Sequence, residues 1–150
     1  MARWFAGAVI YRDNENVERE LLVMDCKSLH EKYKGRPMQV KFPGGTEEEH
    51  PEDNNVLDTL RREIVEETDL SLKDGAPMRL VHSETPNPAH FKSFYLIPIE
   101  DCEGSLRTEE KTMGYDWMSA PYWVKADELG RTLYRSHQTA LIKVLQRFGA

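Results

Sequence analysis

Cysteine is scarce in this chain of 150 residues, which has only Cys26 and Cys102. Two such residues give neither a disulfide framework nor the paired spacing of a zinc site, so a reduced, cytoplasmic setting is expected. Long apolar runs are also missing, because none approaches the roughly 20 residues that a membrane-spanning helix needs. The first residues lack the charged start and cleavage site of a signal peptide and are typical of a first strand. No membrane partner is therefore expected.

Positive charge is nearly absent from one part of the sequence. Residues 46–70 hold ten Asp or Glu against two Arg, a balance of −8, whereas the whole chain carries only −6. Such a region repels nucleic-acid polymers and attracts divalent cations. A solvated acidic face is the alternative, and the spacing of the acids has to decide between the two.

The pattern of apolar residues predicts one α+β domain over residues 1–150. No internal repeat, low-complexity tract or linker divides it, and its length suits a single core. Helices are predicted from residues 53–55 to about 68 and over 136–148, with a helical turn at 125–129. An exposed loop is expected at 46–55, a rigid loop at 85–89 and a polar loop at 102–114. Strands or short extended pieces are predicted at 3–12, 18–26, 38–42, 78–84, 90–100, 115–118 and 122–124. This order suggests a mixed β-sheet covered by helices.

Three glutamates crowd one strip of the central helix. At about 100° per residue, Glu63, Glu66 and Glu67 fall within roughly a third of its circumference, beside the apolar stripe that includes Ile64. Like charges at this spacing destabilise a helix and, near its C-terminal end, oppose its dipole. Arg62 reaches Glu66 four residues away, but one arginine does not neutralise three glutamates. A bound Mg²⁺, which prefers oxygen ligands, would.

The segment from the glycine pair to "RREIVEETDL" resembles the Nudix box of the Nudix hydrolases. The second half of the box is matched position by position by Arg62, Glu63, Ile64, Glu66, Glu67 and Leu70. The resemblance implies the α/β/α sandwich of that family, built around a mixed β-sheet. The order of the predicted strands and the closing helix agrees with it.

The chain departs from the Nudix pattern at two positions. Asn54 stands where the first glutamate of the box is expected, and "TEEEHPEDNN" carries a three-residue insertion. Either Glu52 or Asp53 then replaces that glutamate, or nothing does. Asp69 stands where the family has a glycine after the helix, although glycine suits a left-handed cap better.

The resemblance also implies a chemistry. Nudix hydrolases use Mg²⁺ or Mn²⁺ to cut a diphosphate bond in a nucleoside diphosphate linked to another group. Carried over, Glu63, Glu66 and Glu67 are metal ligands, of which Glu66 and Glu67 also count as catalytic. Arg62 orients a glutamate. The backbone at the glycine pair, Gly44 and Gly45, approaches the phosphates.

The general base is a separate expectation, since many family members take a glutamate from a loop outside the box. The sequence offers Glu110, with Glu109 as the alternative, in "RTEEKTMGYDW". Lys34, Arg36 and Lys41 lie upstream of the glycine pair, where solubilising charge is expected and phosphate contact is the alternative. No role is assigned to any histidine, and the two cysteines are expected to be small core or strand residues.

The sequence favours a Mg²⁺-dependent hydrolase that acts on a nucleotide-type diphosphate as a monomer or homodimer. Two other functions stay open. One is a catalytically weakened Nudix-fold module that binds nucleotides or regulates, which the departures at Asn54 and Asp69 motivate. The other is an unrelated domain with an acidic helix. The sequence does not select among nucleoside triphosphates, nucleotide sugars, ADP-ribose and dinucleoside polyphosphates.

Overall fold

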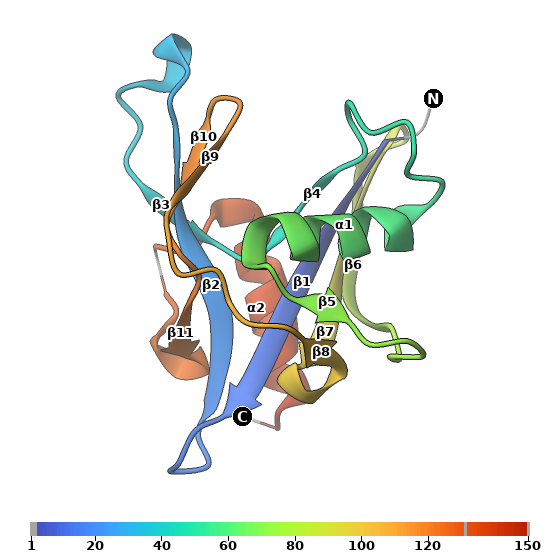
Figure 1. The fold of residues 1–150 in the computed structure, drawn as a ribbon, viewed down its shortest axis with the longest axis vertical. Helices are drawn as coiled ribbons and strands as arrows, with labels where there is room; N and C mark the ends of the chain where they lie inside the picture. Colours follow the sequence, from blue (N-terminus) through green and yellow to red (C-terminus); the bar gives the residue numbers. More distant parts are fainter. Residues whose placement is uncertain (1–2, 131, 150) are drawn as a thin grey trace.

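The computed structural model describes residues 3–130 and 132–149 and is built from short strands and two longer helices (Figure 1). The helices are α1 Val56–Thr68 and α2 Arg135–Arg147, with single 3₁₀ turns at η1 Glu31–Tyr33, η2 Ile99–Asp101 and η3 Ala126–Glu128. The strands are β1 Arg3–Asp13, β2 Arg19–Ser28, β3 Gln39–Lys41, β4 Gly44–Thr46, β5 Ser71–Leu72, β6 Arg79–Asn87, β7 His90–Pro98, β8 Cys102–Glu103, β9 Lys111–Met113, β10 Asp116–Met118 and β11 Tyr122–Lys125. No helix in the described part of the chain is long and apolar enough to cross a membrane.

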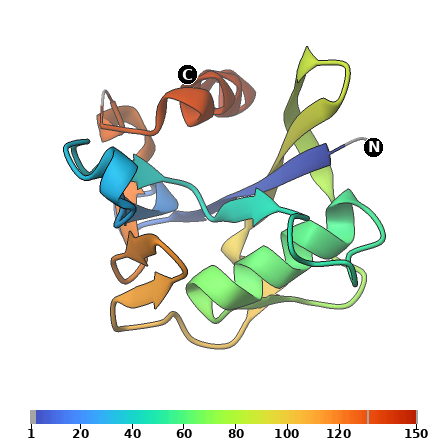
Figure 2. The same cartoon turned by 90° about the horizontal axis from the view of Figure 1, so that it is seen from above.

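The main sheet is mixed and lies between the two long helices. Its longest path runs β6-β7-β1-β2-β10-β9, and β3 and β11 pair with β2 while β4 pairs with β1. Among the strand pairs of this sheet in the described residues, β1 and β7 run parallel and the others are antiparallel. Seen from above, α1 covers one face and α2 the other (Figure 2). The predicted α+β class and α/β/α layering are thus confirmed.

Alternation along β1 places one hydrophobic core on each face of the sheet. Val9 belongs to the core under α2, whereas Ala8 and Ile10 belong to the core under α1. Successive side chains of a strand point to opposite faces, so a run of consecutive apolar residues serves both cores. Helix α2 contributes Leu141 to the first core, and helix α1 contributes Ile64 to the second.

The two central strands separate at one end, and this separation opens the molecule. β1 and β2 are paired only at Tyr11–Asp13 and Arg19–Leu21. Beyond that point β2 pairs instead with β3 and β10, and β1 pairs with β4 and β7. Two arms result, which form the V of Figure 1.

Two loop predictions were wrong, and one short strand was not predicted. Gly44 and Gly45 are part of that strand, β4, because their missing side chains let β4 lie against β1. The predicted rigid loop at 85–89 is largely strand, since β6 extends to Asn87. β6 is an edge strand with a register shift before Asn87, and prolines are tolerated at such edges. The polar loop at 102–114 contains the short strands β8 and β9.

Candidate active site

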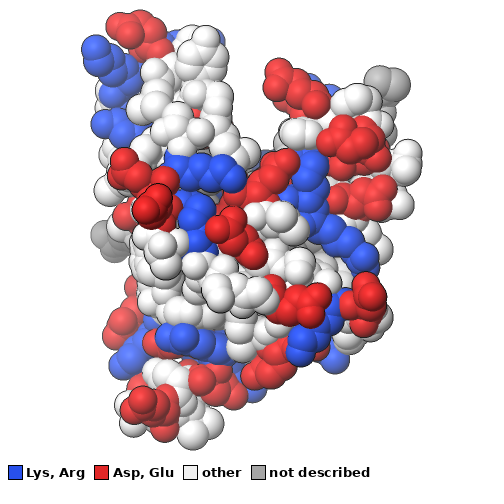
Figure 3. Space-filling view, in the orientation of Figure 1, with Lys and Arg blue, Asp and Glu red and all other residues white. Residues whose placement is uncertain are grey.

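A cleft of about 960 Å³ lies between the two arms. One wall comes from the end of β2, from β3 and from the β9–β10 turn; the other comes from β4, the loop after it and α1. The space-filling view shows this notch, with positive and negative side chains side by side below it (Figure 3). Gly44, Gly45, Glu63 and Glu67 are among the described residues that line it. The structure therefore brings these four predicted site residues together.

Helix α1 presents Glu63 and Glu67 to the cleft, and a capping residue fixes each of its ends. Asn55 is the N-cap, and its side chain accepts a hydrogen bond of 2.9 Å from the backbone N–H of Asp58. Asp69 closes the other end in a left-handed conformation with φ of 66°. The aspartate thus adopts the backbone conformation for which a glycine was expected. Between the two caps, Glu63 and Glu67 lie buried on the face toward β4.

Arg62 forms hydrogen bonds to several carboxylates on one side of the helix and holds them in place. Its Nη1 donates to Glu63 Oε1 at 2.9 Å and to Glu66 Oε2 at 3.1 Å. Its Nη2 donates to Asp53 Oδ2 at 2.8 Å and to the carbonyl oxygen of Thr46 at 2.8 Å. The predicted contact between Arg62 and Glu66 is present. One guanidinium thus fixes three acids relative to β4.

Of the two acids that could replace the missing box glutamate, Asp53 lies beside Arg62 and Glu52 does not. The side chain of Asp53 is 3% exposed and faces Arg62, whereas that of Glu52 is 60% exposed and faces His50. Asp53 also accepts a 2.8 Å hydrogen bond from the hydroxyl of Thr59. Asp53 therefore supplies the carboxylate next to Arg62, and this part of the expected exposed loop is not exposed.

Glu67 is held by β3 and β4 instead of by Arg62. The backbone N–H of Gly44 donates to Glu67 Oε1 at 2.8 Å, and Lys41 Nζ donates to Glu67 Oε2 at 3.0 Å. Burial lowers the pKa of Lys41, but the charge and hydrogen bond of Glu67, together with the charges of Cys26 and Glu63, raise it above its ordinary value, so this lysine stays protonated. The expectation that Lys41 is an exposed solubilising charge was wrong. Its side chain is half-buried because it neutralises Glu67.

The two glycines have different packing roles. A Cβ on Gly44 would lie 2.6 Å from the carbonyl oxygen of Ala6, so this glycine allows the backbones of β1 and β4 to meet. A Cβ on Gly45 would lie 2.3 Å from Glu63 Oε1. Gly45 thus leaves the space that the Glu63 carboxylate fills. These roles come in addition to the predicted approach of phosphates, which stays a prediction.

The donor set has the chemistry of a divalent-cation site. Asp53, Glu63, Glu66 and Glu67 supply four carboxylates against the two cations of Arg62 and Lys41, a formal charge of −2. Burial, and after it the charge of Glu67, raises the pKa of Glu63 to about 7, so this carboxyl group is partly protonated near neutral pH. Among the described residues, no group of three or more His, Cys, Asp or Glu side chains is arranged to hold a metal ion. Mg²⁺ does not need a complete set of protein ligands, because it keeps waters and substrate phosphates as ligands.

Two predicted residues, Glu66 and Glu110, are not among the described residues that line the cleft. The side chain of Glu66 is 30% exposed beside Arg62. Glu110 is exposed on the loop before β9, as is Glu109. The next residue, Lys111, donates from Nζ to the backbone carbonyl of Glu66 at 2.6 Å, so this loop runs beside the last turn of α1.

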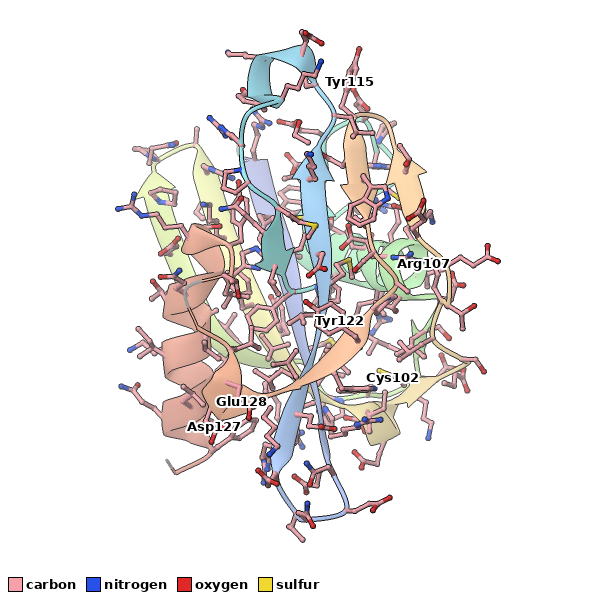
Figure 4. All side chains as sticks on the ribbon, turned by 90° about the vertical axis from the view of Figure 1, so that its left-hand side faces the viewer. Cys102, Arg107, Tyr115, Tyr122, Asp127 and Glu128 are labelled. Carbon is pink, nitrogen blue, oxygen red and sulfur yellow. The ribbon has the colours of Figure 1, made fainter. Side chains whose placement is uncertain are left out.

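Arg107 supports the end of α1, and the sequence analysis did not single it out. It is 9% exposed and lies between the end of α1 and the strands β9 and β10 (Figure 4). Its Nη2 donates to the carbonyl oxygens of Glu67, at 2.8 Å, and of Ser119, at 3.1 Å, and its Nη1 donates to that of Glu109. A cation against the last carbonyls of a helix satisfies them and complements the helix dipole. No local motif marks this arginine, because its partners are backbone atoms from distant segments.

His137 is the other residue without a sequence signal. It is buried at the start of α2, where Nδ1 accepts a 3.1 Å hydrogen bond from the backbone N–H of Phe42 and the two rings stack at 5.7 Å. Burial, together with the charges of Lys41 and Lys92, lowers the pKa of His137 to about 3. The ring is therefore neutral at the base of the cleft.

The family follows from a match over nearly the whole chain. A NUDIX domain model matches residues 1–148. The chain therefore belongs to the NUDIX family, whose members generally cleave nucleoside diphosphate derivatives and use divalent metal ions. Its enzyme class is that of the Nudix pyrophosphohydrolases. No curated protein sequence gives a significant match.

Solved structures of similar fold support this assignment. A MutT NUDIX hydrolase from Burkholderia pseudomallei aligns with a TM-score of 0.66 and 23% identity, over 96% of this chain and 98% of that one. The NUDIX domain of Shewanella oneidensis NrtR, complexed with ADP ribose, aligns with a TM-score of 0.68 and 15% identity, over 99% and 89%. MutT from Aliivibrio salmonicida and Vibrio cholerae gives 0.65 and 14%, over 98% and 99%. At these low identities, the alignments show a shared fold.

Proposed function

We propose that this chain is a Mg²⁺-dependent hydrolase, active also with Mn²⁺, that cleaves the diphosphate bond of a nucleoside diphosphate linked to another group. One observation carries the proposal. Glu63 and Glu67, two of the matched box glutamates, line the cleft beside the glycine pair in a cluster of formal charge −2. A divalent cation neutralises that charge and makes the cleft acceptable to a polyphosphate.

In this proposal Glu63, Glu66 and Glu67 hold the metal ion. When bound, the ion supplies an activated water and neutralises charge that develops on the phosphates. Arg62 keeps Glu63 and Glu66 in place through the same nitrogen. Lys41 and the backbone N–H of Gly44 fix both oxygens of Glu67. Such fixed charges lower the reorganisation needed during the reaction.

Glu110, or its neighbour Glu109, is the proposed general base outside the helix. Their loop is tied to the last turn of α1 by Lys111 and Arg107. A glutamate there would accept the proton of the attacking water. Loss of turnover on replacing Glu110 but not Glu109 by glutamine assigns the role to Glu110.

The decisive test uses Glu66→Gln and Glu67→Gln against a panel of nucleotides with Mg²⁺. Each change keeps shape and removes charge, so we expect hydrolysis to fall by about 10²-fold or more. Glu103→Gln, on an exposed carboxylate of β8, is the matched control and retains turnover. Melting curves establish that all three variants fold. Unchanged turnover in both helix variants contradicts the proposal, and nucleotide binding without phosphate release in the native chain favours a binding module.

A further inference from the structure

A second hollow, here called the basic pocket, opens from the cleft. It has a volume of about 630 Å³ and is lined by Arg36, Pro37, Gln39, Lys92, Tyr134, Arg135 and Ser136. All of these except Arg135 also line the cleft, so the two spaces are continuous. Among the described residues, neither α1 nor any acidic side chain contributes to the lining of the basic pocket.

Three cations converge on this pocket from different parts of the fold. Arg36 comes from the loop before β3, Lys92 from β7 and Arg135 from the first turn of α2. Within residues 3–130 and 132–149, no carboxylate lies within ion-pair distance of any of the three. Glu84, the cross-strand partner of Lys92, faces His82 instead, at 3.4 Å. The positive charge of the basic pocket is therefore not neutralised by an ion pair with any carboxylate of the described residues.

Nearby groups add donors without removing that charge. Tyr134 and Ser136 bring hydroxyl groups to the lining. The guanidinium of Arg36 lies 4.3 Å from the ring centroid of Tyr33, which limits the directions in which its planar fork points. Arginine, lysine and hydroxyl donors together match the oxygens of a phosphate group.

We infer that the basic pocket binds a phosphate group of the substrate other than the two joined by the scissile bond. The inference rests on the proposed function, which places the scissile diphosphate at the glutamates of α1. One cleft then has an acidic end that holds a metal ion and a basic end that holds a second anionic group. The substrate class is a nucleoside diphosphate derivative with an additional phosphate, either on the ribose or in a longer polyphosphate chain.

Two matched ligand pairs test this inference and separate the two sources of phosphate. The first is ADP-ribose with and without a 2′-phosphate; the second is diadenosine tetraphosphate against diadenosine diphosphate. Calorimetry in metal-free buffer measures both affinities for each protein. We expect one pair to show binding about tenfold tighter, or more, for the member with extra phosphate. The pair that shows it identifies the source.

Variants of the pocket provide the second arm of the test. Arg36→Gln, Lys92→Gln and Arg135→Gln each reduce the affinity ratio toward one, whereas Lys143→Gln, an exposed charge further along α2, leaves it unchanged. The ratio is taken within one protein, so a change in the fraction folded cancels. A ratio near one for both pairs in the native chain overturns the inference, as does a preference that survives in all three variants.

Hydrolysis of the same compounds with Mg²⁺ keeps this inference distinct from the proposed function. Cleavage of both members of each pair at equal rate, with equal affinity, overturns the basic pocket and leaves the hydrolase standing. Selective binding without cleavage supports the pocket and removes the hydrolase.

Discussion

Gly45 offers a substitution whose effect on the site is set by the structure. In Gly45→Ala the new Cβ would be 2.3 Å from Glu63 Oε1 and 2.5 Å from Glu63 Cδ. Ordinary contacts begin near 3.4 Å, so the carboxylate must retreat by about 1 Å. The atom that moves, Glu63 Oε1, accepts the 2.9 Å hydrogen bond from Arg62 Nη1. The change therefore acts on the orientation of a proposed metal ligand.

The expected cost differs between activity and stability. A misplacement of about 1 Å in a reacting assembly reduces turnover by about 10²-fold. Weakening this hydrogen bond costs up to about 1.5 kcal/mol of unfolding free energy, and restricting the unfolded chain returns about 0.4–1 kcal/mol. We expect a net loss of about 1 kcal/mol or less.

Gly44→Ala is the matched control, because the same added methyl group meets backbone instead of a flexible side chain. Its Cβ would lie 2.6 Å from the Ala6 carbonyl oxygen and 2.8 Å from Gly7 Cα. Moving β4 away from β1 should lower the unfolding free energy by about 1–3 kcal/mol. Urea unfolding and Mg²⁺-dependent turnover are measured for both variants. Full turnover in Gly45→Ala, or equal losses of stability in the two variants, refutes this account of the glycine pair.

Three further predictions concern residues around the cleft. Arg107→Gln leaves buried carbonyls at the end of α1 without donors, so it should lower the unfolding free energy measured in urea by about 3 kcal/mol. Arg61→Gln, on the exposed side of α1, is the control and should cost less than about 0.5 kcal/mol. Equal losses in the two variants contradict the capping role. The pKa of His137 is about 3 in the folded chain and 6.5 in the unfolded chain, so its contribution to stability should be complete above pH 6.5 and should fall on acidification, by about 2 kcal/mol at pH 5. His137→Gln should flatten this dependence of the unfolding free energy on pH. An unchanged dependence contradicts the claim that His137 is buried in its neutral form. Asp53→Asn should reduce turnover by about tenfold while Glu52→Gln leaves it intact, since only Asp53 contacts the orienting guanidinium; the reverse order would assign the missing carboxylate to Glu52.

The layered fold was predictable because its signals are local and periodic. The stripe on α1 and the apolar runs of β1 and β2 depend on side-chain spacing alone. The fixed register of the Nudix box likewise placed Glu63 and Glu67 on one helix. The structure adds that these two carboxylates face β4 and are buried there.

What sequence reasoning missed depends on contacts between distant segments. β4 pairs with β1 because glycine lets the two backbones come close together. A glycine pair in a sequence indicates a turn just as readily, so residue type alone does not predict this strand. Lys41 lies 26 positions from its partner Glu67, and Arg107 lies 40 from the same residue. Exposed and buried basic residues look alike in a sequence. Only the fold shows which carbonyl or carboxylate each one meets.

Titration calorimetry with Mg²⁺, in the presence of a non-hydrolysable nucleotide analogue, tests the central claim most directly. The account predicts saturable binding to the native chain, with affinity reduced at least about tenfold in Glu63→Gln and in Glu67→Gln. It also predicts unchanged affinity in Glu103→Gln. Absence of Mg²⁺ binding to the native chain, or equal affinity in all four proteins, contradicts the claim that these helical carboxylates hold the metal ion.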